Sequence, residues 1–212
     1  MARLILACRT LERELNTVME KLHCMDPVIW LAPGEHNVPA KRRIAIENVL
    51  SEADGYDEVV LVMSFCGGSV IGLNSGRKRL LLPCFDDCLG LLLTEDRRKD
   101  AYYLTEGWLA GERNILEEYR ISQEKYGAER TKRIFSAMFR GYRQILYLDT
   151  GCGDPAGQEK AGEAAQLLNL EFRVISGTLS RLEALVAGKT GNGILEIGPN
   201  QVISLEMRGS RP

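Results

Sequence analysis

The chain has 212 residues, of which 45% are apolar and 26% charged, with a formal net charge of −2 at pH 7. This composition is typical of a folded globular protein with one sizeable core. The near balance of charges provides no basic face of the kind that nucleic acid requires. No apolar run approaches the roughly 20 residues that cross a bilayer, so we expect no membrane contact and a cytoplasmic location.

The first half of the chain alternates between predicted strands and helices. The apolar stretch at residues 3–7 is shorter than the roughly 7–15 residues of a secretory signal core, so it predicts a first strand. Apolar residues at helical spacing predict helices at 10–22 and 40–53. A second strand at 28–31 lies between these two helices.

Two further apolar runs, at 58–64 and 79–82, predict buried strands, and a short helical turn at 89–93 follows the second of them. Such alternation is typical of βαβ units and a parallel sheet. The next segment, at about 106–141, is charged and helical, with a break near Tyr126 and Gly127. We expect it to be an insertion of helices.

The alternation then resumes toward the C-terminus. The predicted elements are a strand at 144–149, a helix at 156–169, a strand at 171–176, a helix at 179–187, and short strands at 194–197 and 202–205. The last two flank a Gly-Pro turn, which predicts a hairpin. We therefore predict a single α/β domain over residues 1–212: an open, mostly parallel sheet with helices on both faces, a helical insertion after the fourth strand and a C-terminal β-hairpin.

Several reactive residues follow the predicted strands directly. In open parallel sheets, ligands bind beyond the carboxyl ends of the strands, where the strand order reverses. Residues of this kind are Cys8, His36, Cys66, Asp87 and Cys88. Thiolates with a histidine or carboxylate suit zinc or iron. We therefore expect Cys8, Cys66 and Cys88 to bind a metal, with His36 or Asp87 completing or orienting the ligand shell.

Two local features would favour thiolates. Gly67 and Gly68 follow Cys66 and would let backbone amides approach an anion, and Cys88 opens a predicted helix. Two alternatives stay open: a metal-free reactive thiol at Cys66 or Cys88, and cysteines that are buried as small apolar residues.

The other three cysteines are expected to be peripheral. Cys84 lies four residues before Cys88 and could share its helix face, although a bystander role fits it better. Cys152 sits between two glycines in a loop, where it could be a reactive thiol or simply a permissive loop residue. Cys24 is assigned to burial.

Three further residues are candidates for holding a cofactor or small-molecule ligand. Tyr103 and Trp108 could line a pocket over a flat cofactor, although aromatic clusters are more often core. Asp149 ends a predicted strand, where it could position a ligand or cap the next helix. Phosphate-loop and dinucleotide fingerprints do not occur in the sequence, which disfavours a nucleotide.

Short strings in a fixed order give the chain a resemblance to a known family. They are Ala7-Cys8, the run from Leu11 to Leu15, His36-Asn37 with Pro39, Cys66-Gly67, Pro83 through Asp87-Cys88, the run from Tyr103 to Trp108, Asp149-Thr150, and the closing Gly-Pro turn. Together they cover most of the chain. The sequence resembles the DUF1638 family of proteins of unknown function.

The resemblance implies a setting for the chemistry. Members of that family occur in methanogens and other anaerobes, often encoded beside corrinoid-dependent methyltransferases. It thus implies a role near methyl transfer in one-carbon metabolism, with a corrinoid protein or methyltransferase as partner and a corrinoid as a second cofactor beside the metal. The positions that match the family pattern are Cys8, His36, Cys66, Asp87, Cys88 and Trp108.

Three functions follow as hypotheses. The first is a thiolate-rich zinc or iron site in a metal-dependent enzyme of the methyltransferase type. The second is a non-catalytic accessory protein that binds a corrinoid protein or its cofactor through the charged helices. The third is a metal-free enzyme with Cys66 or Cys88 as nucleophile.

Overall fold

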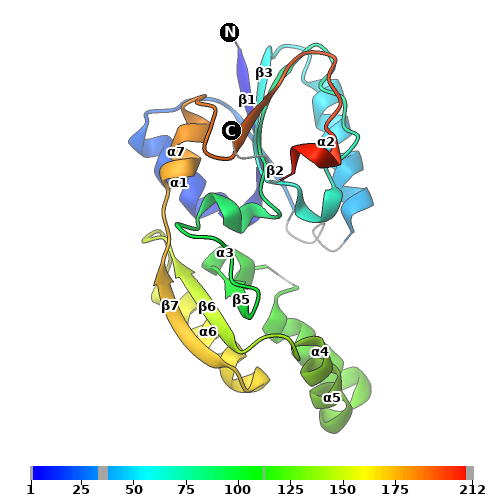
Figure 1. Cartoon of the computed structure of the whole chain (residues 1–212), viewed down its shortest axis with the longest axis vertical. Helices are drawn as coiled ribbons and strands as arrows, with labels where there is room; N and C mark the ends of the chain where they lie inside the picture. Colours follow the sequence, from blue (N-terminus) through cyan, green and yellow to red (C-terminus); the bar gives the residue numbers. More distant parts are fainter. Residues whose placement is uncertain (1, 33–37, 112, 209–212) are drawn as a thin grey trace. The chain divides into compact units, whose positions relative to one another are not determined.

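The computed structural model describes residues 2–32, 38–111 and 113–208, and the chain folds into two compact units. The first unit comprises Met1–Leu92 and Thr178–Pro212, and the second comprises Leu93–Gly177. Both combine strands and helices (Figure 1). Each unit has a sheet of its own.

The first unit is built on a five-stranded sheet with the order β2-β1-β3-β4-β8. Its strands are β1 (Arg3–Cys8), β2 (Val28–Leu31), β3 (Glu58–Val62), β4 (Arg79–Pro83) and β8 (Ile194–Ile197). The first four are mutually parallel, and β8 pairs antiparallel with β4. The predicted fold class, an open and mostly parallel sheet, is confirmed.

Helices cover both faces of this sheet, as predicted. Helices α1 (Glu12–Lys21) and α7 (Ser180–Val186) lie on one side, and α2 (Pro39–Glu52) lies on the other (Figure 1). The chain runs from β1 outward to β2 and then returns to β3 on the other side of β1. Right-handed crossovers in these opposite directions place their helices on opposite faces. The strand order therefore reverses between β1 and β3.

The core of this unit is formed by strands that are apolar on both faces. All residues of β3 are buried, and β1 is buried from Leu4 onward. Buried strands of this kind occur where helices cover both sides of a parallel sheet. The short 3-10 turns η1 (Arg9–Leu11), η3 (Cys66–Gly68) and η4 (Cys88–Leu91) follow β1, β3 and β4.

The C-terminal end differs from the predicted hairpin. Strand β8 forms where the first of the two short strands was expected, but it pairs with β4. The second is reduced to a single bridge between Val202 and Asn74. After it the chain forms the short turn η5 (Leu205–Met207).

The second unit has a parallel sheet with the order β5-β6-β7. Its strands are β5 (Ala101–Leu104), β6 (Gln144–Asp149) and β7 (Glu171–Ser176), and its helices are α3 (Glu106–Leu109), α4 (Ile115–Tyr126), α5 (Ala128–Met138) and α6 (Pro155–Leu168). The sequence predicted a helical insertion at about 106–141 in a single domain, and it assigned the strands at 144–149 and 171–176 and the helix at 156–169 to the one sheet of that domain. In the structure these elements form a separate unit, in which β5, a strand that the sequence did not predict, pairs with β6.

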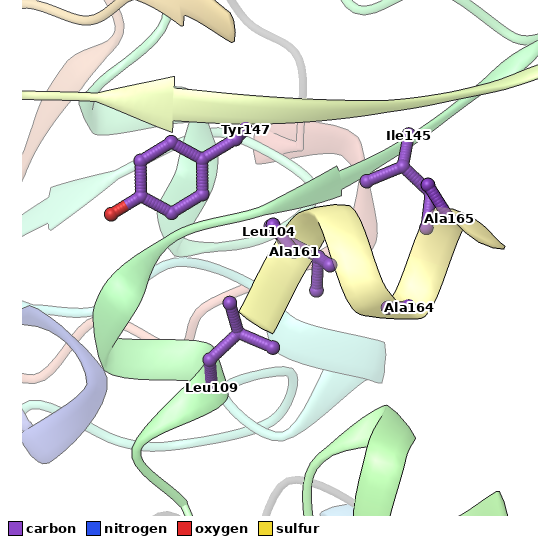
Figure 2. Close-up of a cluster of buried hydrophobic side chains, with 7 residues drawn as sticks. All are labelled: Leu104, Leu109, Ile145, Tyr147, Ala161, Ala164 and Ala165. Atoms are coloured by element: carbon purple, nitrogen blue, oxygen red, sulfur yellow. The ribbon is translucent and has the colours of Figure 1, made fainter. Parts of the chain in front are cut away.

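An apolar cluster holds this second sheet against α6. Alanines 161, 164 and 165 of α6 lie over Leu104 of β5 and Ile145 of β6, with Leu109 and Tyr147 beside them (Figure 2). Small side chains on the helix allow close packing on the sheet, so this face is tightly filled. Asp154 caps α6 by accepting a hydrogen bond from the Ala156 backbone amide at 2.9 Å.

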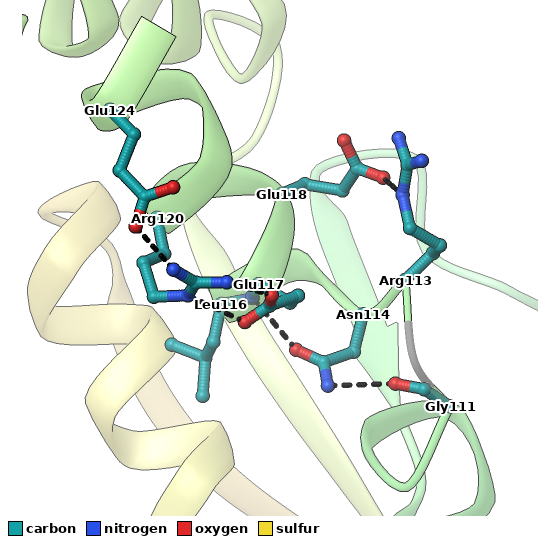
Figure 3. Close-up of polar contacts among 8 residues, drawn as sticks. All are labelled: Gly111, Arg113, Asn114, Leu116, Glu117, Glu118, Arg120 and Glu124. Atoms are coloured by element: carbon teal, nitrogen blue, oxygen red, sulfur yellow. Dashed lines mark hydrogen bonds and ion pairs between the residues drawn. The ribbon is translucent and has the colours of Figure 1, made fainter.

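Helices α4 and α5 meet at Gly127, which confirms the predicted break. Gly127 adopts φ +79°, a conformation that favours glycine. Asn114 caps α4 by accepting bonds from the backbone amides of Leu116 and Glu117, while its own amide donates to the Gly111 carbonyl (Figure 3). On the surface of α4, Arg120 forms ion pairs with Glu117 and Glu124.

Candidate functional site

Three of the predicted ligands are brought together in the first unit. Cys8 ends β1, Cys66 lies in the turn after β3, and Cys88 opens the turn after β4. The carboxyl ends of β1 and β3 border the place where the strand order reverses. This is the position at which open parallel sheets place their ligands. We call Cys8, Cys66 and Cys88 the thiol triad.

The sulfur atoms of the thiol triad are in contact. The Sγ atoms of Cys66 and Cys88 are 3.6 Å apart. Cys88 is hydrogen-bonded to Cys8 as well as to Cys66. The Sγ of Cys8 also lies 3.0 Å from Oγ1 of Thr10, itself buried. Three residues that are distant in the sequence thus form one buried cluster.

A buried arginine, which the sequence analysis did not single out, completes the cluster. Arg42 has no exposed surface, and it interacts electrostatically with all three cysteines of the triad and by a hydrogen bond with Cys8. Burial works against its charge, but the negative charge of the neighbouring sulfurs outweighs burial and raises the pKa of Arg42. A buried guanidinium requires such anionic partners.

The surroundings of Cys88 favour its protonated form. Hydrogen bonds with Cys66 and Cys8, then burial, then the charge of these two sulfurs raise the pKa of Cys88 well above its ordinary value. Three thiols in contact titrate as a set, because each thiolate disfavours the next. Without a bound cation, the triad therefore holds at least one proton near neutral pH.

The turn that carries Cys66 has an unusual backbone. Cys66, Gly67 and Gly68 have φ values of +39°, +70° and +89°. Left-handed conformations are strained for residues other than glycine, by about 1–3 kcal/mol. A Cβ added at Gly67 would lie 3.2 Å from Cγ of Pro39 at the start of α2. This turn is thus closely packed against the helix that supplies Arg42.

The turn that carries Cys88 is fixed by backbone bonds and by Phe85. The backbone amides of Phe65 and Cys66 donate to the carbonyls of Phe85 and Asp86, which joins the two cysteine-bearing turns. A Cβ at Gly90 would lie only 2.3 Å from the Phe85 side chain. The glycine therefore lets the aromatic ring pack against the turn.

The other two predicted metal ligands are Asp87 and His36. The carboxylate of Asp87 accepts a hydrogen bond from the Leu89 backbone amide at 3.1 Å and caps the turn that Cys88 opens. That role holds Cys88 in place. His36 lies outside the described residues. Gly67 is exposed and Gly68 half-buried.

Tyr103, Trp108 and Asp149 all belong to the second unit. Tyr103 is buried, and its hydroxyl accepts a hydrogen bond from the Arg98 backbone amide at 3.0 Å. Trp108 is half-buried in α3. The carboxylate of Asp149 accepts a bond from the Gly151 backbone amide at 2.9 Å, whereas Asp154 caps the following helix. A cofactor role for these three residues stays a prediction.

The other three cysteines have different surroundings. Cys84 is buried, and its backbone amide donates to the Gly193 carbonyl. Cys152 is half-buried, with its Sγ 3.7 Å from the Thr150 carbonyl. Cys24 differs from the expected burial: it is half-buried and donates to Asp26 at 3.2 Å. Its neighbourhood is polar because Arg3 also pairs with Asp26.

The described part of the chain lacks two further features. Across residues 2–32, 38–111 and 113–208, no group of three or more histidine, cysteine, aspartate and glutamate side chains is arranged to hold a metal ion, and this includes the thiol triad as it stands, so a metal there requires a rearrangement of its side chains. Within those same ranges, every helix is too short or too polar to cross a membrane.

The fold and the triad define an α/β protein with a buried thiol–arginine cluster at the strand-order reversal of a parallel sheet. The sequence model of a family described as "Protein of unknown function (DUF1638)" matches residues 30–186. The chain belongs to this family. The match includes Arg42, Cys66 and Cys88, and Cys8 precedes it. Neither the curated proteins nor the solved structures contain a match to the chain.

Proposed function

We propose that the thiol triad binds a transition-metal ion, zinc or iron, through the thiolates of Cys8, Cys66 and Cys88. The observation that carries this proposal is the contact between Cys66 and Cys88 beside Cys8 and Arg42. Thiolates are the preferred ligands of zinc and of iron in sulfur-rich sites. Burial excludes competing water from such a site.

The sulfur–sulfur distance suits a shared metal. Two sulfurs bound at about 2.3 Å to one tetrahedral ion lie roughly 3.8 Å apart. The Sγ atoms of Cys66 and Cys88 are 3.6 Å apart, so this edge of the tetrahedron needs almost no adjustment. Cys8 would exchange its contact with Thr10 for the metal, and this rearrangement is what closes the ligand set.

The charge of the cluster also suits a divalent ion. Three thiolates and a dication leave one negative charge, which is unfavourable in a buried position. The guanidinium of Arg42 supplies the one positive charge that balances it. The presence of a buried arginine in place of a hydrophobic residue is then explained by its role as the counter-charge.

Three thiolates leave a fourth position for a further ligand or for substrate. An ion with such a position supplies Lewis-acid activation of a bound thiol or related group. We propose that this chemistry serves corrinoid-dependent methyl transfer in anaerobic one-carbon metabolism, with a corrinoid protein or methyltransferase as partner. The family resemblance supports this setting. The same proposal includes His36 or Asp87 as the fourth ligand of the metal, and a corrinoid as a second cofactor.

Metal analysis of protein purified without oxygen tests the site. We expect about one equivalent of zinc or iron in the wild type, and well under half of that in Cys8→Ser, Cys66→Ser and Cys88→Ser. Cys84→Ser is the matched control, because Cys84 is also buried in the same unit. Less than about half an equivalent in the wild type, unchanged in the triad variants, would refute the metal.

The position of Arg42 supports one alternative function, that of a metal-free enzyme with a cysteine nucleophile. A metal-free thiolate nucleophile at Cys66 would be stabilised by the adjacent guanidinium, as in other activated cysteines. In that case, metal-free protein would show rapid alkylation of one thiol near neutral pH. Uniform slow labelling of all thiols would count against this alternative.

A further inference from the structure

The sulfurs of Cys66 and Cys88 are placed for a reaction that needs no metal. Both cysteines are reduced, and their Sγ atoms are 3.6 Å apart, which is van der Waals contact. A disulfide joins two sulfurs at about 2.05 Å, so the two atoms need to approach each other by roughly 1.5 Å. The pair is thus one small movement of its side chains away from a covalent link.

The backbone holds these two cysteines side by side. Strands β3 and β4 are adjacent and parallel, and the turns that follow them carry Cys66 and Cys88. The Cys66 backbone amide donates to the Asp86 carbonyl at 2.9 Å, two residues before Cys88. Neighbouring strands lie about 4.8 Å apart, and the Cα atoms of a disulfide lie about 4.4–6.8 Å apart. Positions beyond the ends of two adjacent strands are therefore compatible with a disulfide.

The two thiols differ in their exposure to solvent. Cys66 has an exposed fraction of 7%, and Gly67 beside it is exposed, whereas Cys88 has no exposed surface. A reagent from solution therefore reaches Cys66 first, and so small an opening favours a small reagent. Hydroperoxides are small oxidants that convert a thiol to a sulfenic acid, which then condenses with a second thiol. Exposure thus assigns the first reaction to Cys66 and the second to Cys88.

We propose that a hydroperoxide oxidises Cys66 and Cys88 to a disulfide, and that this disulfide prevents the thiol triad from binding metal. In the first step the Cys66 sulfur attacks a peroxide oxygen, the O–O bond breaks, and water or an alcohol leaves. In the second step the Cys88 sulfur attacks the Cys66 sulfur, the S–O bond breaks, and water leaves. The two thiols lose two electrons and two protons, and the peroxide takes them up.

The consequence for the metal rests on the function proposed above. Metals bind thiolates, and a sulfur within a disulfide has no negative charge to offer. Oxidation would leave Cys8 as the single thiolate of the triad, so a bound ion would be released. The left-handed backbone of Cys66, at φ +39°, adds strain, and strained disulfides are the readily reduced ones. A dithiol reductant would therefore restore the ligand set.

Peptide mapping of the full-length protein tests the disulfide directly. The protein is stripped of metal with a chelator, treated with hydrogen peroxide, alkylated, and digested with trypsin without reduction. Trypsin places Cys66 in fragment 44–77 and Cys88 in fragment 80–97. The second fragment also contains Cys84, so the mapping uses the Cys84→Ser protein as its parent. We expect the two fragments to be joined in most of the protein, and to separate after treatment with dithiothreitol.

Two variants of this parent assign the roles of the thiols. In Cys88→Ser the oxidised Cys66 has no thiol beside it to condense with, so its sulfenic acid should accumulate and react with dimedone. In Cys8→Ser the two fragments should be joined as in the parent. Absence of the joined fragments in the parent, a link from Cys8 to Cys88 in their place, or equal dimedone labelling in the parent and Cys88→Ser would overturn the proposal.

Metal release separates this proposal from the function proposed above. Protein loaded with zinc should release about one ion for each disulfide formed, as followed with a chromogenic chelator. A disulfide that forms in a protein unable to bind zinc would support the redox chemistry and refute the metal. Zinc that stays bound after the disulfide has formed would overturn the proposed effect of the disulfide on metal binding.

Discussion

At the scale of single residues, the electrostatics of the thiol triad depend on Arg42. Its guanidinium is a positive charge beside three sulfurs in a fully buried region. The attraction between this charge and the sulfurs depends on the protonation of the thiols, because thiolates are anionic and thiols are neutral. The arginine and the triad therefore act as one electrostatic unit.

We predict that Arg42→Met weakens zinc binding at least about tenfold, because the metal–thiolate cluster would keep an unbalanced buried charge. Arg42→Lys should retain part of the affinity, since it keeps the charge but loses the planar donor geometry. Competition with a chromogenic chelator measures both. Lys41→Met, an exposed neighbour on the same helix, is the control. Equal affinities in all four proteins would contradict a charge-balancing role.

Cys88 predicts how the stability of the metal-free protein depends on pH. Its pKa is raised in the folded state, so the unfolded chain loses this proton first as the pH rises. The stabilisation is thus complete below the ordinary thiol pKa of about 8.5 and is lost at higher pH. One bound proton corresponds to about 1.4 kcal/mol per pH unit.

Urea unfolding of the metal-free protein between pH 8 and 10 measures this effect, a range set around the unfolded thiol pKa of about 8.5. The unfolding free energy should fall with pH in the wild type and in Cys84→Ala. It should fall less steeply in Cys88→Ala. A slope that is the same in all three proteins would show that Cys88 is not the proton-holding thiol.

At the scale of elements, short turns after the strands decide where the chemistry lies. The turn after β3 takes three consecutive positive φ angles, and the turn after β4 is capped by Asp87. Both turns are anchored to each other by backbone hydrogen bonds. Rigid positioning of this kind keeps ligating or nucleophilic groups within reach of one another.

The cap of α4 gives a prediction at this scale. Asn114 accepts from two backbone amides of α4 and donates to the carbonyls of Leu109 and Gly111. Asn114→Ala should destabilise the second unit by about 1–2 kcal/mol, because the cap and the links to the preceding loop are both lost. Arg113→Ala removes only an exposed ion pair and should change stability little. Helicity followed during thermal unfolding distinguishes the two variants.

The sequence predicted many of these elements for physical reasons that are local. Helical spacing revealed α1 and α2, apolar runs revealed β1, β3 and β6, and Gly127 marked the break between α4 and α5. Strand β5 was missed because it has four residues and follows a charged segment. The partners of β6 and β8 were also beyond the sequence pattern, since strand pairing depends on contacts between distant residues.

The site was predicted in part. The rule that ligands bind at carboxyl strand ends placed Cys8, Cys66 and Cys88 at one edge, and the structure brings them into contact. Arg42 was missed because charged residues on helices are usually exposed. A signal was present: Arg42 shares the helical spacing of the buried residues Ile46 and Leu50, so it occupies the inward face of α2.

At the scale of the whole molecule, the chain forms two compact units with separate parallel sheets. The first unit contains the thiol triad, at the carboxyl ends of β1, β3 and β4. The second unit carries Tyr103, Trp108 and the charged helices α4 and α5. The proposed metal site therefore lies entirely within the first unit.

The most direct test of that metal is X-ray absorption spectroscopy at the zinc or iron edge, on protein purified without oxygen. We predict three sulfur ligands at about 2.3 Å in the wild type and fewer in Cys66→Ser. The Cys84→Ser control should give the wild-type spectrum. A bound ion surrounded only by oxygen and nitrogen would contradict the account, because it would place the metal away from Cys8, Cys66 and Cys88.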